Sequence, residues 1–190
     1  VVSARSTSEC LSSKLFVSDG DRRVPRHRTV AEYLAAKALA QKIDRGLPVQ
    51  RVLAMMSGRD GRIAEPLRGL YAWLAVHCAR ERSYLVDRDA LGLVMYGDVR
   101  QFSVSEKRSI LNALYREGER FRWFRNENWD AHPFGALGTR DMEQTFRELL
   151  ASSEREPAHQ ALLDCVADAI EQGERELRLP KELERVARDS

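Results

Sequence analysis

The sequence predicts an all-α protein that begins with one small β-hairpin. Most of the 190 residues fall into short segments whose apolar side chains recur every three or four positions, the period of an amphipathic helix. Glycine and proline separate these segments, as they do at the ends of successive helices. One early stretch differs: Asp19 and Gly20 lie between two short runs with apolar residues, a pattern typical of a hairpin turn.

The first unit is expected to span residues 1–46. Its hairpin covers about residues 14–25, and a helix follows over about residues 29–45. Thr29 and Glu32 have the spacing of a capping box, in which each side chain accepts a hydrogen bond from an N–H group at the helix start. A hairpin therefore leads directly into a strongly capped helix.

One face of this first helix is expected to be buried. Val30, Leu34 and Ala38 recur at the helical period and would line that face. Gly46 then ends the helix, because glycine readily adopts the left-handed conformation found just after a helix C-terminus.

Residues 47–190 are expected to form a series of short helices. Prolines, which fit the first turn of a helix because its N–H groups have no intrahelical partner, mark several starts: Pro48, Pro66, Pro157 and Pro180. Ser103 and Glu106 form a second capping box, and two short helices are expected around residues 82–86 and 89–95. The predicted apolar stripes are Val49, Val52, Leu53 and Met56; Leu67, Leu70, Tyr71, Leu74 and Cys78; Ile110, Leu111, Leu114 and Tyr115; Met142, Phe146, Leu149 and Leu150; and Leu162, Leu163, Val166 and Ile170.

These helices are expected to stack as an array. Each has a single apolar stripe and short connections, so neighbours should pair antiparallel and bury their stripes against each other. The spacing of roughly 35 to 45 residues per helix pair is that of HEAT-like units. The predicted architecture is a hairpin followed by a HEAT-like helical array.

A long irregular segment, residues 119–138, interrupts the helical pattern. About twenty residues without helical periodicity are unusual inside a compact domain. The segment is interpreted either as a loop whose aromatic side chains fill a gap between helices or as a recognition surface, since aromatic rings beside arginine form interface hot spots or stack on bases. The candidate interaction residues are Trp123, Phe124, Trp129, Arg122 and Arg125.

Composition indicates a protein of the reducing cytoplasm. The formal net charge is only +2, which gives no global field for a polyanion. No apolar run approaches the roughly 18 residues needed to span a bilayer, so no membrane partner is expected. The three cysteines are far apart and odd in number, as in proteins with reduced thiols. Because Val1 is neither an initiator Met nor part of an apolar signal core, the chain is expected to be excised from a longer protein.

One segment resembles a known family. Residues 27–36 read His-Arg-Thr-Val-Ala-Glu-Tyr-Leu-Ala-Ala, which is similar to the phrase that follows the wing of the winged-helix domain in NACHT-type STAND NTPases. The resemblance covers about 25 to 30 residues of hairpin and helix, and it implies that the hairpin is a winged-helix remnant followed by the family's superhelical region. It also implies that His27 lies near the phosphates of ADP, that ATP or ADP with Mg²⁺ binds the parent protein, and that the upstream NTPase domain is a partner.

The expected function is that of a regulatory and scaffold segment of a STAND signalling NTPase, coupling nucleotide state to autoinhibition, sensing or oligomerisation. A protein ligand or self-association is the expected contact. Two alternatives stay open. One is a winged-helix nucleic-acid-binding module that uses Arg22, Arg23, Arg26 and Arg28 on phosphates. The other is a free-standing α-solenoid adaptor for a protein partner.

No catalytic or metal-binding residues are predicted. A P-loop needs a lysine after a glycine-rich run, and none of the five lysines follows a suitable glycine. His77 beside Cys78 is interpreted as structural, His132 as a loop residue, and His159 as part of an exposed first helical turn. The chain is therefore expected not to be an enzyme and to hold no cofactor by itself.

The isolated chain should bind neither ATP nor ADP measurably and should not hydrolyse ATP. Without a phosphate-binding loop and a Mg²⁺ ligand, only His27 and its neighbours remain to contact a nucleotide. Isothermal titration calorimetry checks this, and ADP binding tighter than about 100 μM contradicts it.

Overall fold

The computed structural model describes residues 12–121, 123–124, 132–152 and 156–173, and over these residues the fold is all-α with an N-terminal β-hairpin, as predicted. Strands β1 (Phe16–Asp19) and β2 (Arg22–Pro25) pair antiparallel, with Val17 opposite Val24. Gly20 lies in the turn with a φ of 57°, a left-handed conformation that suits glycine.

Eight α-helices follow the hairpin in the described part of the chain. They are α2 (Arg28–Asp44), α3 (Val49–Met56), α4 (Arg68–His77), α5 (Arg82–Val86), α6 (Ala90–Tyr96), α7 (Val104–Arg120), α8 (Glu143–Leu150) and α9 (Pro157–Gln172). Short 3₁₀ turns lie between them: η1 (Glu65–Leu67), η2 (Ala79–Glu81), η3 (Val99–Gln101), η5 (Pro133–Leu137) and η6 (Arg140–Met142). The helix predicted to start at Pro180 lies outside the described residues.

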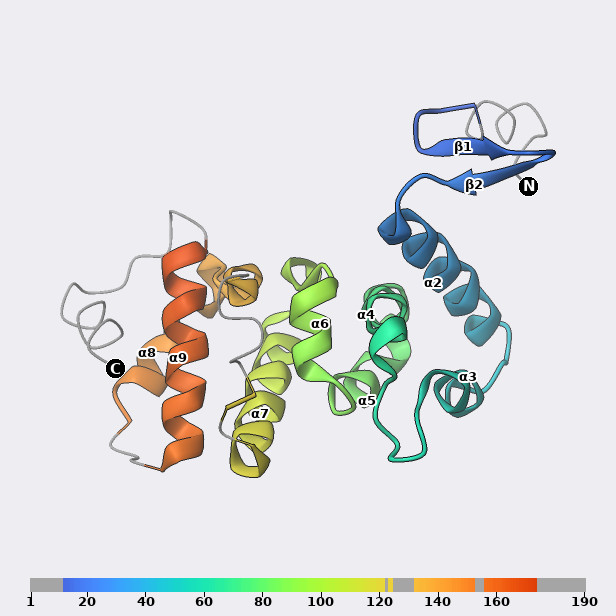
Figure 1. The fold of residues 1–190 in the computed structure, drawn as a ribbon. Helices are drawn as coiled ribbons and strands as arrows, with labels where there is room; N and C mark the ends of the chain where they lie inside the picture. Colours follow the sequence, from blue (N-terminus) through green and yellow to red (C-terminus); the bar gives the residue numbers. More distant parts are fainter. Residues whose placement is uncertain (1–11, 122, 125–131, 153–155, 174–190) are drawn as a thin grey trace.

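The helices succeed one another along an elongated body, with the hairpin and α2 at one end and α8 and α9 at the other (Figure 1). Most of the packing joins elements that are two apart in the chain: α2 packs on α4, α4 on α6, α5 on α7 and α7 on α9. The 3₁₀ turn η5 contacts both α6 and α9 and so closes the gap between them.

The start of α2 differs from the prediction. His27 is the N-cap residue and forms no side-chain cap, so the Thr29–Glu32 capping box is absent. Thr29 instead lies inside the first turn, because the helix already begins at Arg28. The carboxylate of Glu32 accepts a hydrogen bond from Nε of Arg28 at 2.6 Å, which removes it from a capping role.

The buried face of α2 also differs. Ala36 and Ala40 are the buried residues of this helix, whereas Leu34 is 42% exposed and Ala38 is exposed. Helix α2 packs on α4, where the ring of Tyr33 contacts Trp73 edge-on, and the predicted face of Val30, Leu34 and Ala38 is not the one buried by this contact.

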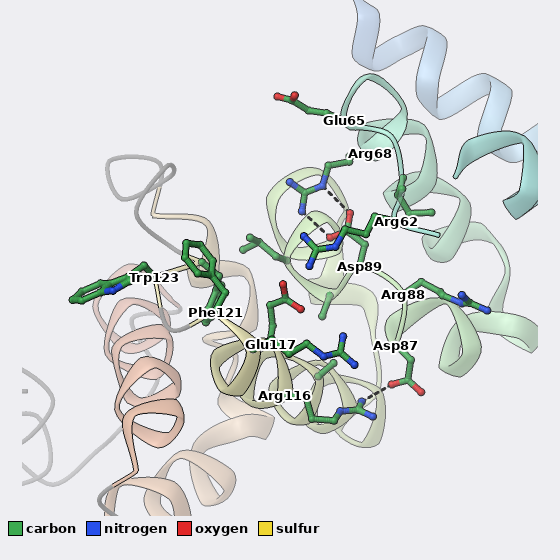
Figure 2. Close-up of a pocket in the computed structure, with 16 residues that line it drawn as sticks. Arg62, Glu65, Arg68, Asp87, Arg88, Asp89, Arg116, Glu117, Phe121 and Trp123 are labelled. Atoms are coloured by element: carbon green, nitrogen blue, oxygen red, sulfur yellow. Dashed lines mark hydrogen bonds and ion pairs between the residues drawn. The ribbon is translucent and has the colours of Figure 1, made fainter. Parts of the chain in front are cut away.

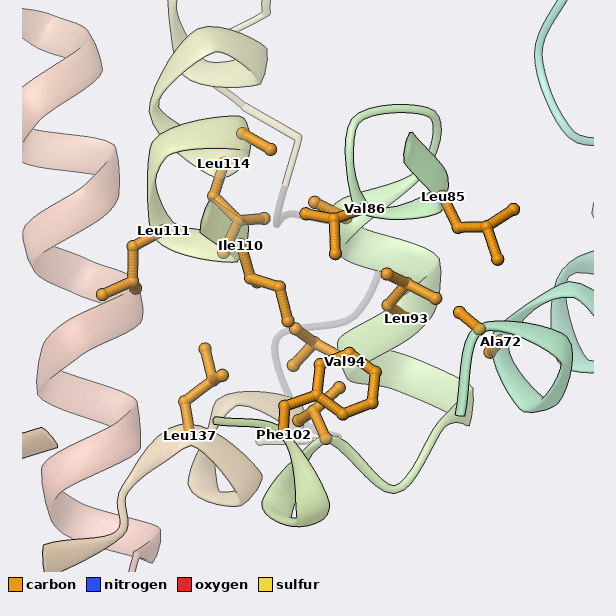
Figure 3. Packing of buried hydrophobic residues seen from close by; sticks show 14 of the residues in the cluster. Ala72, Leu85, Val86, Leu93, Val94, Phe102, Ile110, Leu111, Leu114 and Leu137 are labelled. Atoms are coloured by element: carbon orange, nitrogen blue, oxygen red, sulfur yellow. The ribbon is translucent and has the colours of Figure 1, made fainter. Parts of the chain in front are cut away.

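The predicted helix caps, helix bounds and apolar stripes agree better with the structure in the rest of the chain. Ser103 and Glu106 form the predicted capping box of α7, and α5 has the predicted bounds. The predicted stripes contribute buried residues to one continuous core that extends from Ala36 to Ala169. Around the middle of this core, side chains of α7 face those of α5, α6 and the η5 region (Figure 3).

The irregular segment is shorter than predicted. Helix α7 extends to Arg120, and η5 covers residues 133–137 of the expected excursion. Phe134 and Leu137 of η5 are fully buried, so this end of the segment belongs to the core. Asp168 of α9 fixes it, with one carboxylate oxygen 2.6 Å from Nδ1 of His132 and the other accepting the N–H of Phe134 at 3.1 Å.

A buried cation joins α7 to the η5–η6 region. The side chain of Lys107 is 2% exposed, and its Nζ donates to Oγ1 of Thr139 at 2.7 Å and to Oδ1 of Asp141 at 3.1 Å. Burial by itself would raise the pKa of Asp141, but the hydrogen bonds from Thr139 and Lys107 and the charge of the ammonium group together hold that pKa below its ordinary value.

Replacing Asp141→Asn should lower the free energy of unfolding by about 1–2 kcal/mol at pH 7. The reason is that the buried ammonium of Lys107 loses its counter-charge, although it keeps its hydrogen bond to Thr139. The partly exposed position of Asp141 keeps the loss below that of a fully buried pair. Since the folded-state pKa of Asp141 is depressed, this contribution is present above its unfolded-state pKa and is lost as the pH falls through the folded-state value.

Urea denaturation at pH 7 and below pH 4 measures both effects. The matched control is Glu148→Gln, which removes an exposed ion pair with Arg108 of 3.7 Å and should change stability by less than about 0.5 kcal/mol. Equal losses for the two variants would show that the Lys107 contact contributes no more than a surface pair.

Candidate functional site

The candidate site is a groove of about 560 Å³ whose walls come from three separated parts of the chain. One wall is formed by residues 62–68 before and at the start of α4, and another by residues 87–91 between α5 and α6. The third comprises the C-terminal half of α7 with Phe121, Trp123 and Phe124. Figure 2 shows charged side chains from all three walls around one space.

An arginine–aspartate pair forms one side of the groove. Nε and Nη2 of Arg68 donate to the two carboxylate oxygens of Asp89, each at 2.7 Å. Asp89 is also the N-cap of α6 and accepts the N–H of Gly92 at 2.9 Å. The hydrogen bond to Asp89 raises the pKa of Arg68, although burial opposes that rise. A Cβ at Gly92 would collide with the Asp89 carboxylate, so a larger residue there would displace that carboxylate.

The other arginines of the groove differ in how they are paired. Arg116 forms an exposed ion pair with Asp87 at 2.7 Å. Arg88 donates to the hydroxyl of Tyr84 at 2.7 Å and lies over its ring, so it meets no counter-charge there. Arg62 and Arg120 form no side-chain ion pair with any residue that the structure describes.

The exposure of the aromatic residues after α7 agrees only in part with the predicted interaction surface. Trp123 is 51% exposed, and Phe121, which the sequence analysis did not single out, is 56% exposed. Phe124 is only 6% exposed and belongs to the core, so this candidate interaction residue does not present an exposed ring. Arg122, Arg125 and Trp129 lie outside the described residues.

His27 does not line the groove. It is exposed and directly precedes α2, beside the hairpin, whereas the groove is lined by residues 62–68, by residues 87–91 and by the end of α7 with the residues after it. Its neighbour Arg28 is engaged within the fold, because Nη2 donates to the carbonyl of Pro66 and Nε to Glu32. The structure therefore does not bring His27 together with Trp123.

The other histidines have structural surroundings. The ring of His77 packs edge-on against Tyr33, with ring centroids 4.8 Å apart, and burial followed by the charge of Lys37 lowers its pKa. His159 is buried, contrary to the prediction of an exposed first turn, because the start of α9 packs against α7. Burial also raises the pKa of the adjacent Cys78 thiol to about 11, which disfavours a reactive thiolate.

Sequence reasoning missed most of this groove. Asp89 could have been recognised as an N-cap, since the helix that follows it was predicted. Its partner Arg68 lies 21 positions earlier, and no local pattern links the two. Arg62 belongs to a loop whose distance from α7 depends on the packing of α4 against α6.

The remaining findings concern metal binding, membrane-spanning helices and similarity to known proteins. No group of three or more His, Cys, Asp or Glu side chains is placed there to bind a metal ion. None of the helices among these residues is long and apolar enough to cross a membrane. Comparison of the chain with family models, with curated proteins and with solved structures finds no match.

Replacing Asp89→Ala should lower the free energy of unfolding by about 2–3 kcal/mol, because α6 loses its N-cap and Arg68 loses its bidentate partner. Asp89→Asn should cost about half as much, since asparagine is an equally good N-cap but carries no charge. Chemical denaturation monitored by circular dichroism measures both variants.

Asp98→Ala is the matched control, because Asp98 precedes η3, its side chain makes no cap, and its carboxylate accepts a hydrogen bond from the side chain of Gln101. It should change stability by less than about 0.5 kcal/mol. If Asp89→Ala behaves like this control, the Arg68–Asp89 pair does not hold α4 and α6 together.

Proposed function

We propose that the chain is a non-catalytic regulatory and scaffold segment of a STAND-type NTPase, which couples nucleotide state to autoinhibition, sensing or oligomerisation. The observation that carries the proposal is the position of His27. It is exposed at the joint between the hairpin and a 17-residue helix, where an upstream domain could reach it. In the family that this segment resembles, the histidine at this position lies near the phosphates of ADP.

The packing supports a mechanical role for the helices. Helix α2 packs on α4, and α4 packs on α6, which contacts η5. Arg28 adds a polar link, since it joins the first turn of α2 to the carbonyl of Pro66 in η1, just before α4. A displacement at the joint therefore has a continuous path of packed elements into the array.

The groove supports an interaction role for the helical array. Its exposed aromatic rings and arginines are the residue types enriched in protein interfaces. ATP or ADP with Mg²⁺ would be held by the upstream NTPase domain, which is one proposed partner. A protein ligand or a second copy of the chain is the other.

A nucleic-acid-binding hairpin is the second candidate. Arg22, Arg23 and Arg26 are exposed on or beside β2, so they could contact phosphates, whereas Arg28 is engaged within the fold. Electrophoretic mobility shifts at two salt concentrations test this function, because phosphate contacts weaken steeply as salt rises. If neither DNA nor RNA is retarded at low salt, this candidate is excluded.

The proposed function is tested in a longer protein that contains this chain together with a P-loop. There, His27→Ala should speed ADP release, because the closed state alone loses a charge-assisted contact of roughly 1–3 kcal/mol. Stopped-flow release of a fluorescent ADP analogue measures the rate.

Thr29→Ala is the control for this experiment, since Thr29 is exposed in the same helical turn and forms no cap. It should leave ADP release unchanged. Release rates that are equal for wild type and His27→Ala would contradict the proposed nucleotide contact.

A further inference from the structure

We propose that the groove between the start of α4, the α5–α6 connection and the end of α7 binds an acidic segment of a partner protein, whose apolar side chains pack on Phe121 and Trp123. This binding rests on the interaction role proposed above for the groove, and it specifies the chemistry of the partner. It does not depend on the nucleotide contact of His27.

The charges of the groove favour a carboxylate-bearing ligand. The two lining aspartates are already neutralised, Asp89 by Arg68 and Asp87 by Arg116. Arg62 and Arg120 have no such partner within the described residues, and a carboxylate is the natural acceptor for the fork of N–H donors on a guanidinium group.

Two glutamates set a limit on the charge that the groove accepts. Figure 2 shows the carboxylate of Glu117 facing the same space as Arg62, whereas Glu65 projects away from it. A ligand that carries a negative charge at every unit, such as a nucleic acid backbone, would meet Glu117 repulsively. A peptide with one or two acidic side chains can contact the arginines and leave Glu117 facing its polar backbone.

The aromatic rings supply the apolar part of the interface. Phe121 and Trp123 are each more than half exposed, and both line the groove beside Arg120. Large exposed aromatic groups next to arginine are the composition of binding hot spots, because a partner that covers them removes apolar area from water and leaves few polar groups unpaired.

The groove wall is held in place before any ligand arrives. The two hydrogen bonds between Arg68 and Asp89, together with the cap on Gly92, fix that side of the groove to both α4 and α6. A preformed wall reduces the conformational entropy that binding would otherwise remove.

The test uses the whole chain and fluorescence anisotropy of labelled probes. The acidic probe is a Gly/Ser-rich peptide of about ten residues in which two glutamates flank a phenylalanine, a length that suits recognition of an extended segment. A matched peptide has glutamines in place of the glutamates, and a single-stranded thymidine oligonucleotide of similar length serves as the polyanion.

The wild-type chain should bind the acidic peptide about tenfold more tightly than the glutamine peptide, a difference set by the charge-assisted contacts. Arg62→Glu combined with Arg120→Glu should abolish this preference. The control Arg51→Glu, at an exposed position of α3 outside the groove, should retain it. If the double reversal does not fold, Arg62→Gln with Arg120→Gln replaces it and should reduce the preference several-fold.

Three results would overturn the proposal: equal or undetectable binding of the two peptides, tighter binding of the oligonucleotide than of the acidic peptide, or a preference that survives the groove variants. The peptide measurement contains no nucleotide. A failure here therefore leaves the ADP-release experiment untouched, and an unchanged ADP release leaves this result untouched.

Discussion

The arrangement of the helices depends on one partly buried cation, Arg82 of α5. Its guanidinium donates to the carbonyls of Ala75 and Val76 at the end of α4, at 2.9 and 2.8 Å, and to the carboxylate of Glu106 in α7 at 2.9 Å. It also lies over the ring of Phe102, 4.3 Å from its centroid. A helix end leaves carbonyls without intrahelical partners, so one side chain satisfies α4 while it holds α7 in position. If this group were removed, three elements would lose their common contact.

The same device recurs along the molecule, where one polar side chain satisfies groups on two elements. Arg68 with Asp89 joins α4 to α6, Lys107 joins α7 to the η5–η6 region, and Asp168 joins α9 to η5. Apolar packing between short helices is not directional, whereas these hydrogen bonds have fixed geometry. They therefore select one arrangement from the several that similar apolar stripes would permit. At the contact between α7 and α9, Gly118 leaves room for the backbone of α9 at Ala158.

The parts of the fold that were predictable are those governed by neighbouring residues. The capping box at the start of α7 formed because both of its members lie within one turn. The corresponding capping box in α2 did not form. Arg28 donates a hydrogen bond to the Glu32 carboxylate and another to the carbonyl of Pro66, 38 positions away. The buried face of α2 was also mispredicted: periodicity favours Leu34, whereas Ala36 and Ala40 are buried and Tyr33 contacts Trp73 of α4. The groove could not be predicted at all, because its walls meet only after α4, α6 and α7 have packed.

These non-local contacts also relate the two proposed contact points to each other. The joint at His27 is attached to the array through α2, and α2 packs on α4. One side of the groove is attached to α4 through Arg68. Helix α4 is therefore shared between the end proposed to sense nucleotide and the groove proposed to receive a partner. Because a packed helix moves as a unit against its neighbours, a shift of α2 against α4 would alter the same helix from which Arg68 reaches Asp89. Sharing of α4 would give the two proposed sites a physical route for coupling.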